Sequence, residues 1–196
     1  MDYFEKDCLC IKFDLKSGYH HIEISEEFQT YLWFSWNQKY YRYTVLPFGL
    51  SSAPFIFTKC LRPVVKFWRQ QGIKIVLYLD DGFVFASTKH ECLSVSETIQ
   101  KSLSEFGLLI NFEKSIFYPT QNIEWLGILW DSQYFSISVP ERRLRDTVEL
   151  LQRVVKNFPR VTARELARVV GKIISMSPVM GYICSMMTRF SSMEIA

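Results

Sequence analysis

One stretch of the sequence constrains the fold more than any other: residues 74–87, which read KIVLYLDDGFVFAS. Two apolar runs rich in β-branched and aromatic residues flank the adjacent carboxylates Asp80 and Asp81, and Asp81-Gly82 is a strong hairpin signal. The stretch predicts an antiparallel hairpin with both carboxylates at or beside its turn. Ionised carboxylates held against an apolar hairpin repel each other, and a divalent cation would offset that cost. The alternative is a solvated turn without a metal, because aspartate is common in turns.

The amino-acid composition restricts the class of protein but does not identify it. The chain has 196 residues, of which 48% are hydrophobic, enough for one well-filled domain with a small appendage. Its formal net charge of +3 permits a nucleic-acid partner but does not argue for one. The five cysteines are scattered without a CxxC pair, so we expect reduced thiols in an intracellular protein, cytoplasmic or nuclear. No apolar run is long enough to cross a membrane, and we expect no membrane partner.

The N-terminal part predicts a strand followed by a hairpin. A short apolar run over residues 10–13 ends in Asp14, which indicates a buried strand that delivers a carboxylate at its end. A helix cap or a plain turn is the alternative for Asp14 alone. Next come TYLWFSW and KYYRYTV, separated by Asn37-Gln38, which indicate an antiparallel hairpin. We expect its aromatic side chains to be core residues and cross-strand pairs.

A helix follows the sequence LPFGLSSAPFIF. Ser51 or Ser52 is expected to cap it, Pro54 suits its first turn, and Gly72 is expected to end it. Pro63 inside the helical run predicts a kink or an early stop.

The rest of the chain is expected to form a helix, then three short strands, then two further helices. A capping box at Thr88 and Glu91 opens a helix that ends at Gly107, and short strands are expected over residues 108–115, 122–130 and 134–139. Helices are expected over residues 142–158 and from Thr162 to about residue 176. The first helix should bury one apolar stripe, formed by Leu144, Val148, Leu151 and Val155. Its basic face is expected to be solvated, and a nucleic-acid contact is the alternative. Composition changes near Pro140 from β-rich and aromatic to helical and basic, so we expect a domain boundary there, between residues 1–139 and 140–196.

The three carboxylates together suggest a chemistry. An antiparallel sheet that brings Asp14 beside Asp80 and Asp81 would form a cluster able to bind two divalent metals. Two metals about 3.5–4 Å apart clamp the attacking and leaving oxygens of an in-line phosphoryl transfer. That reaction class follows if the geometry holds.

Five blocks resemble, in order and spacing, the motifs of reverse transcriptases from retrotransposons, DIRS-type or gypsy-like. They are FDLKSGYHHI, LPFGLSSAPFIF, YLDD, GLLINFEKS and WLGILWD. The resemblance implies an α+β fold: a polymerase palm, with an antiparallel sheet of ferredoxin-like type packed on helices, followed by a small helical thumb. The basic fingers region that precedes the first block in that family is largely missing here.

The resemblance also implies roles for individual residues. Metal ligation would fall to Asp14, the Leu15 carbonyl, Asp80 and Asp81, and Lys114 would act beside them as a catalytic cation near the triphosphate. Tyr19 would crowd a ribose 2′-OH and so favour deoxynucleotides. The substrate-binding residues would be Leu15, Tyr19, Phe48, Gly49 and Tyr78. The primer-contacting residues would be Trp125, Leu126 and Gly127.

The function that follows is RNA-directed DNA polymerase activity with two Mg²⁺ or Mn²⁺ ions. A primer 3′-OH on an RNA or DNA template would attack a deoxynucleoside triphosphate, in a parent polyprotein that also carries fingers and ribonuclease H regions. One alternative is a truncated, non-catalytic palm-like domain that binds nucleic acid or a protein partner. Another is a nucleotidyl cyclase-like phosphoryl transferase that acts on a free nucleotide.

Overall fold

The computed structural model describes the backbone of residues 3–195 and the side chains of residues 3–189. Two compact units make up the chain, residues 1–121 and 122–196, and each is described by itself. The division into a catalytic domain over 1–139 and a thumb over 140–196 concerns functional parts and stays a prediction.

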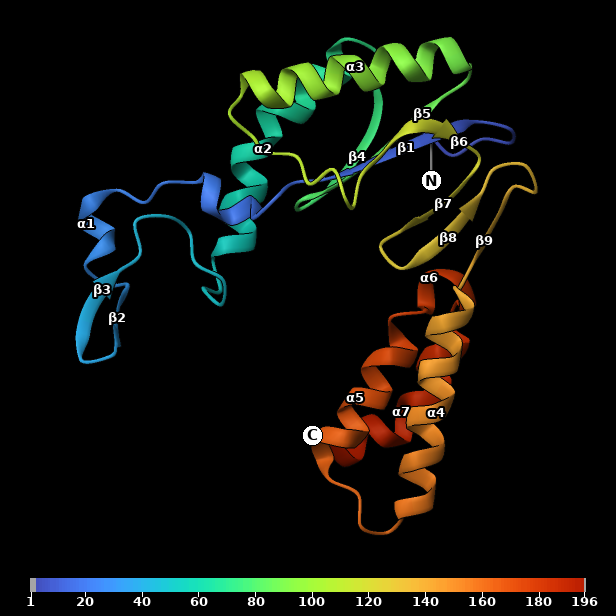
Figure 1. Ribbon diagram of the computed structural model, residues 1–196. Helices are drawn as coiled ribbons and strands as arrows, with labels where there is room; N and C mark the ends of the chain where they lie inside the picture. Colours follow the sequence, from blue (N-terminus) through green and yellow to red (C-terminus); the bar gives the residue numbers. More distant parts are fainter. Residues whose placement is uncertain (1–2, 196) are drawn as a thin grey trace. The chain divides into compact units, whose positions relative to one another are not determined.

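A four-stranded antiparallel sheet organises the first unit (Figure 1). Two long helices, α2 and α3, pack on it and supply one side of its core. Their bounds are α2 Ala53–Gln70 and α3 Lys89–Glu105. The strand order is β4-β5-β1-β6, with bounds β1 Leu9–Asp14, β4 Lys74–Tyr78, β5 Asp81–Ala86 and β6 Ile116–Thr120. The predicted α+β fold with an antiparallel sheet packed on helices is confirmed.

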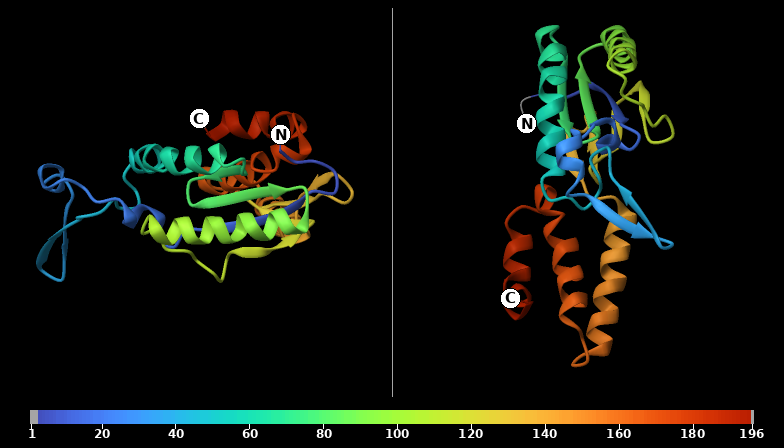
Figure 2. Two further views of the ribbon diagram at one scale, coloured as in Figure 1. Left: turned by 90° about the horizontal axis from the view of Figure 1, so that it is seen from above. Right: turned by 90° about the vertical axis from the view of Figure 1, so that its left-hand side faces the viewer.

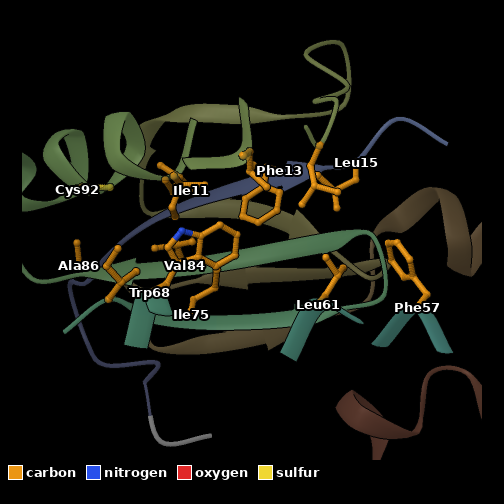
Figure 3. Packing of buried hydrophobic residues seen from close by; sticks show 14 residues of the cluster. Ile11, Phe13, Leu15, Phe57, Leu61, Trp68, Ile75, Val84, Ala86 and Cys92 are labelled. Atoms are coloured by element: carbon orange, nitrogen blue, oxygen red, sulfur yellow. The ribbon is translucent and has the colours of Figure 1, made fainter. Parts of the chain in front are cut away.

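Strand alternation sorts the sheet residues onto two faces. Ile11 and Phe13 of β1 and Val84 of β5 point to the helices, where they are almost completely buried against Trp68 (Figure 3). Because side chains alternate along a strand, Asp14 and Asp81 lie on the other face. The apolar core therefore fixes which face receives the carboxylates.

The β4–β5 hairpin forms as predicted, but its turn lies earlier than the Asp81-Gly82 signal indicated. Tyr78 pairs with Asp81, so Leu79 and Asp80 form the two-residue turn, with Leu79 at φ +53°. Gly82 lies inside β5, opposite Phe13, and a Cβ there would come within 2.2 Å of the Phe13 ring. Gly82 is thus needed for the close approach of an aromatic side chain rather than for the turn.

The predicted hairpin after β1 is present, but its aromatic residues do not form core. Between β1 and it lie a 3₁₀ helix, η1 Gly18–His21, and a short helix, α1 Glu26–Gln29. Strands β2 Trp33–Trp36 and β3 Lys39–Arg42 pair around Asn37-Gln38, and every residue of both strands is exposed. Cross-strand pairing does occur, since Phe34 stacks on Tyr41 with ring centroids 5.5 Å apart. The expectation of core aromatics is wrong because the hairpin stands away from the sheet and helices of this unit (Figure 2).

Helix α2 begins and ends close to the expected residues. Gly72 follows it at φ +82°, and Pro54 lies in its first turn. The side chain of Ser52, at the N-cap position, makes no capping hydrogen bond, so the expected side-chain cap is wrong. The expected early stop at Pro63 is also wrong, because buried Leu61 and Trp68 on either side anchor the helix to the sheet.

Helix α3 begins at the predicted cap, where the Thr88 hydroxyl accepts from the Glu91 amide at 3.2 Å, and Gly107 follows it at φ +72°. The strand predicted over residues 108–115 is wrong. Within that segment only an isolated bridge between Leu15 and Ile110 forms, and the strand that pairs with β1 is β6, directly after it.

The second unit contains a three-stranded antiparallel sheet and a group of helices. The bounds are β7 Asn122–Trp125, β8 Ile128–Asp131, β9 Ser136–Ser138, α4 Glu141–Asn157, α5 Ala163–Ile174, α6 Ser177–Met180 and α7 Ile183–Ile195. The capping box at Thr162 and Glu165 that opens α5 is complete. The apolar stripe predicted for α4 is exposed, with Val155 at 67%, because the helix turns Thr147 and Leu150 inward instead.

Two global features concern the described residues as a whole. All five cysteines are free thiols. Among the described residues, none of the helices combines the length and the apolar character needed to cross a bilayer.

Candidate active site

The register of β1 and β5 places two of the predicted carboxylates opposite each other. Asp14, the last residue of β1, pairs with Asp81, the first residue of β5. The Leu15 amide donates to the Asp80 carbonyl at 2.9 Å, so the neighbouring Asp14–Asp81 pair is a non-hydrogen-bonded one. In such pairs the Cα atoms are about 4.5 Å apart and the side chains are closest. Asp80 lies in the turn beside them.

The electrostatics of this cluster show crowding of negative charge. The pKa of Asp81 is raised above its usual value, first by burial and then by the charges of Asp80 and Asp14. Lys12 and Lys114 act in the opposite direction and lower it. Asp14 is only 9% exposed, and its Oδ2 lies 3.9 Å from the Lys114 Nζ. At Asp81, burial and the two neighbouring carboxylates together outweigh the effect of the two lysines.

The donor set suits a hard divalent cation, because carboxylate and carbonyl oxygens are the ligands that Mg²⁺ and Mn²⁺ prefer. The side chains, as they are placed, fit such a cation only in part. Among the described residues, no three acidic, histidine or cysteine side chains converge closely enough to hold an ion as they stand. Asp14 and Asp81 are opposite each other on adjacent strands, and Asp80 lies in the adjoining turn.

The segment after α3 is fixed to the end of β1 by hydrogen bonds. The Asn111 amide donates to the Asp14 carbonyl at 2.8 Å. The Ser115 hydroxyl accepts from the Asp14 amide at 3.1 Å and donates to the Asn111 carbonyl at 2.7 Å. These contacts hold Lys114 near the carboxylates. Sequence reasoning missed Ser115, because a serine after a lysine carries no signal for a contact 101 residues away.

Aromatic rings lie beside the carboxylate cluster. The Tyr19 ring lies 5.1 Å from that of Phe48 and 5.3 Å from that of Phe57, measured between centroids. Gly18 permits this packing, since a Cβ there would come within 2.9 Å of Phe57 and 3.2 Å of the Asp80 Cβ. The structure thus brings together Tyr19 and Phe48, two of the predicted substrate-binding residues, near the turn that carries Asp80.

The other predicted substrate-binding residues are Leu15, Gly49 and Tyr78. Leu15 is buried directly after Asp14, and Tyr78 is 57% exposed at the end of β4. Gly49 has φ +91°, a left-handed conformation that suits glycine, and a Cβ there would meet nothing within 4 Å. Tyr78 is the cross-strand partner of Asp81, whereas Gly49 lies in the loop between β3 and α2.

Comparison with known proteins decides the family. A family profile described as "Reverse transcriptase (RNA-dependent DNA polymerase)" matches residues 2–129. The chain belongs to the reverse transcriptase family. The resemblance drawn from the five sequence blocks is confirmed.

Relatives of this reverse transcriptase chain include polyproteins of transposons and plant viruses. The Pol polyprotein of transposon gypsy from Drosophila melanogaster is 33% identical over 116 residues, which is 59% of this chain and 11% of the relative. The Pol polyprotein of transposon opus, also from Drosophila melanogaster, is 30% identical over 158 residues, or 81% of this chain and 15% of the relative. An enzymatic polyprotein of Cassava vein mosaic virus is 34% identical over 122 residues, 60% of this chain and 17% of the relative. The chain therefore spans less than a fifth of the length of each.

Solved structures with the same fold include the foamy viral protease-reverse transcriptase in complex with an RNA/DNA hybrid. That likeness has a TM-score of 0.70 at 22% identity and covers 86% of this chain and 21% of the other. The foamy viral enzyme in complex with double-stranded DNA gives a TM-score of 0.67 at 20% identity, over 95% of this chain and 41% of the other. At these identities the likeness shows the fold.

The predicted primer-contacting residues of this reverse transcriptase domain form the β7–β8 turn in the second unit. Trp125 pairs with Ile128, and Leu126 and Gly127 form a two-residue turn, both at positive φ. The Arg143 guanidinium donates to the Gly127 carbonyl at 2.6 Å and fixes the turn. Trp125 is buried, whereas Leu126 is 40% exposed.

A hollow of about 440 Å³ lies elsewhere in the reverse transcriptase domain, between α2 and β4. Its lining includes Leu61, Val65, Leu77 and the cationic side chains of Arg62 and Lys66, but none of the three carboxylates. The carboxylate cluster and this hollow are thus separate features of the domain.

Proposed function

We propose that this chain is the polymerase portion of an RNA-directed DNA polymerase, which joins a deoxynucleoside triphosphate to a primer 3′-OH on an RNA or DNA template. One observation carries the proposal: strand register sets Asp14 opposite Asp81, with Asp80 in the adjoining turn. Family membership supplies the reaction class, and the geometry supplies the candidate residues.

Two divalent cations, Mg²⁺ or Mn²⁺, would be held by Asp14, Asp80, Asp81 and the Leu15 carbonyl. The cations, when bound, stabilise the charge on the attacking and leaving oxygens. The pKa of Asp81 is raised first by burial and then by the charges of Asp80 and Asp14, and a bound cation would offset both effects, which supports the assignment.

Lys114 would place positive charge where the triphosphate loses pyrophosphate. Its ammonium lies 3.9 Å from the Asp14 carboxylate and is 69% exposed, so it can turn toward a substrate phosphate. A cation fixed at that place stabilises charge that develops on the leaving group, and it can also donate a proton.

Tyr19 and Phe48 would form the wall of the nucleotide site. Tyr19 is held between Phe48 and Phe57, so its ring has little freedom to move aside. A fixed ring excludes a ribose 2′-OH by contact and favours deoxynucleotides. Gly49 and Tyr78 would line the same site, and Trp125, Leu126 and Gly127 would contact the primer.

The parent protein would be a polyprotein with fingers and ribonuclease H regions, as the Pol polyprotein relatives support. The free cysteines suit a reducing compartment, cytoplasm or nucleus.

The test is template-directed extension of a labelled primer by this chain, with Mg²⁺ or Mn²⁺. We expect incorporation that falls at least about 100-fold in Asp80→Asn, the scale seen when one charge-stabilising group is lost. Glu97→Gln is the matched control, because Glu97 is an exposed carboxylate on the outer side of α3. The proposal fails if Asp80→Asn incorporates as well as the unaltered chain.

Binding without incorporation would indicate the non-catalytic alternative instead. One observation favours that alternative: among the described residues, no three acidic, histidine or cysteine side chains converge closely enough to hold an ion. Primer-template binding in the absence of nucleotide addition, unchanged in Asp80→Asn, would establish a binding module. Reaction of a free nucleotide without primer would establish the cyclase-like activity.

A further inference from the structure

His21 joins two segments that are far apart in the sequence. Its Nε2 accepts a hydrogen bond from the Leu109 amide at 3.0 Å, and its Nδ1 lies 3.1 Å from the Gly18 carbonyl oxygen. A backbone amide only donates and a carbonyl only accepts. The ring is therefore neutral, with its proton on Nδ1.

The segment that His21 holds is the one that carries Lys114. The Lys16 amide donates to the Leu109 carbonyl at 2.8 Å, so both backbone groups of Leu109 are bonded to residues just after β1. The Asn111 amide then donates to the Asp14 carbonyl, and the Lys114 amide donates to the Asn111 carbonyl at 3.2 Å. Residues 109–114 are thus fixed at successive points against the end of β1.

We propose that His21 is a positioning residue, which fixes Lys114 at set distances from Asp14 and from Tyr19. The 3₁₀ helix that contains His21 also contains Tyr19, and the ring ties this helix to the chain that leads into Lys114. Its catalytic meaning rests on the proposed function, since a triphosphate must meet the lysine and the tyrosine at one spacing. A displacement of about 1 Å in such an arrangement can cost about 100-fold in rate.

The exposure of His21 and Leu109 indicates that their contact does not serve to fill the core. His21 is only partly buried, and the Leu109 side chain is 61% exposed. Neither side chain fills the core beneath the sheet, which consists of other residues. Removal of the ring should therefore release the segment and leave the fold in place.

Two substitutions test the proposal by opposite predictions. His21→Leu removes both hydrogen bonds. His21→Gln places an acceptor at the distance of Nε2 from the backbone and should restore the hydrogen bond from the Leu109 amide. His90→Leu is the matched control, since His90 is exposed in the first turn of α3.

The first measurement is spectroscopic and independent of polymerase activity. In the unaltered chain we expect imidazole nitrogen NMR shifts of the Nδ1-protonated neutral ring, and slow hydrogen exchange at the Leu109 amide. His21→Leu should speed that exchange at least about tenfold and shift the Lys114 amide resonance, whereas His21→Gln and His90→Leu should not. Unchanged exchange at Leu109 and an unmoved Lys114 signal in His21→Leu would overturn the proposal.

The second measurement is primer extension. His21→Leu should lower kcat about 10- to 100-fold with primer-template affinity unchanged, and His21→Gln should recover most of that loss. Equal kcat in His21→Leu and the unaltered chain would overturn the proposal even if exchange at Leu109 changes. If the unaltered chain incorporates no nucleotide, the proposed function fails, while the exchange and shift measurements still decide whether His21 positions Lys114.

Discussion

Gly82→Ala tests the packing that fixes the site. An added Cβ would lie 2.2 Å from the Phe13 Cζ and 2.3 Å from its Cε1, so the ring must move by more than 1 Å. Phe13 is 1% exposed and packs edge-on against Trp68 at 5.9 Å, which leaves little room for that movement. Overpacking of a core costs about 1–3 kcal/mol, and the depth of this overlap places the expected cost near about 3 kcal/mol.

The assay is urea unfolding followed by circular dichroism. With a slope of about 2 kcal/mol per molar urea, a loss of about 3 kcal/mol lowers the midpoint by about 1.5 M. Gly171→Ala is the control, because a Cβ there meets nothing within 4 Å and alanine is favoured in a helix such as α5 by about 0.5–1 kcal/mol.

A second substitution identifies the cause. In Gly82→Ala combined with Phe13→Leu, the smaller side chain relieves the overlap, so the two changes should couple favourably by at least about 1 kcal/mol. The reasoning is refuted if Gly82→Ala costs less than about 0.5 kcal/mol, or if the coupling is absent.

Three further substitutions follow from the same structure. Asp81→Asn should raise the free energy of unfolding at pH 7, because the pKa of Asp81 is raised in the folded state and its ionisation there costs stability as the pH rises. The gain should vanish below pH 3.8, the ordinary pKa of an aspartate. An equal gain in urea titrations at pH 3 and pH 7 would contradict this. Trp68→Phe and Ser102→Ala should couple by about 1 kcal/mol in a double-mutant cycle, because the Trp68 Nε1 donates to the Ser102 hydroxyl at 2.7 Å; a cycle that shows no coupling would be the contrary result. Gly127→Ala should cost about 1–3 kcal/mol, since φ is +71° and the Cβ would meet the Arg143 Nη1 at 2.6 Å; thermal unfolding with an unchanged midpoint would count against it.

Much of the first unit could be predicted from local sequence signals. The apolar alternation of β1, β4 and β5, the Thr88 cap and the terminal glycines each act over a few residues, and the structure forms as those signals indicate. The α+β fold and the hairpin that carries the carboxylates follow from them.

The errors arose where distant contacts decide the outcome. The hairpin with both carboxylates at or beside its turn was predicted, but the role of Gly82 opposite Phe13 was not, because it depends on the pairing of β1 with β5. Residues 108–115 look like a strand but direct their hydrogen bonds to the end of β1. The actual strand, β6, contains Pro119, which is tolerated because β6 lies at the sheet edge.

In the candidate site, too, local features could be predicted and contacts between distant segments could not. The sequence could predict that Asp14 ends one strand and that Asp80 and Asp81 belong to one hairpin. It could not predict the pairing of Asp14 with Asp81, which depends on the register between β1 and β5. The hydrogen bonds of Ser115 and His21 were also beyond it, because both connect segments about 90–100 residues apart.

The most direct test of the central claim is a Mn²⁺ titration followed by NMR, since this ion broadens nearby resonances. We expect selective broadening at residues 14–15 and 80–81, lost in Asp14→Asn and retained in Glu97→Gln. Broadening spread over exposed acidic side chains such as Glu26 and Glu27 of α1, with none at the β1–β5 pair, would contradict the claim that these carboxylates share a cation site.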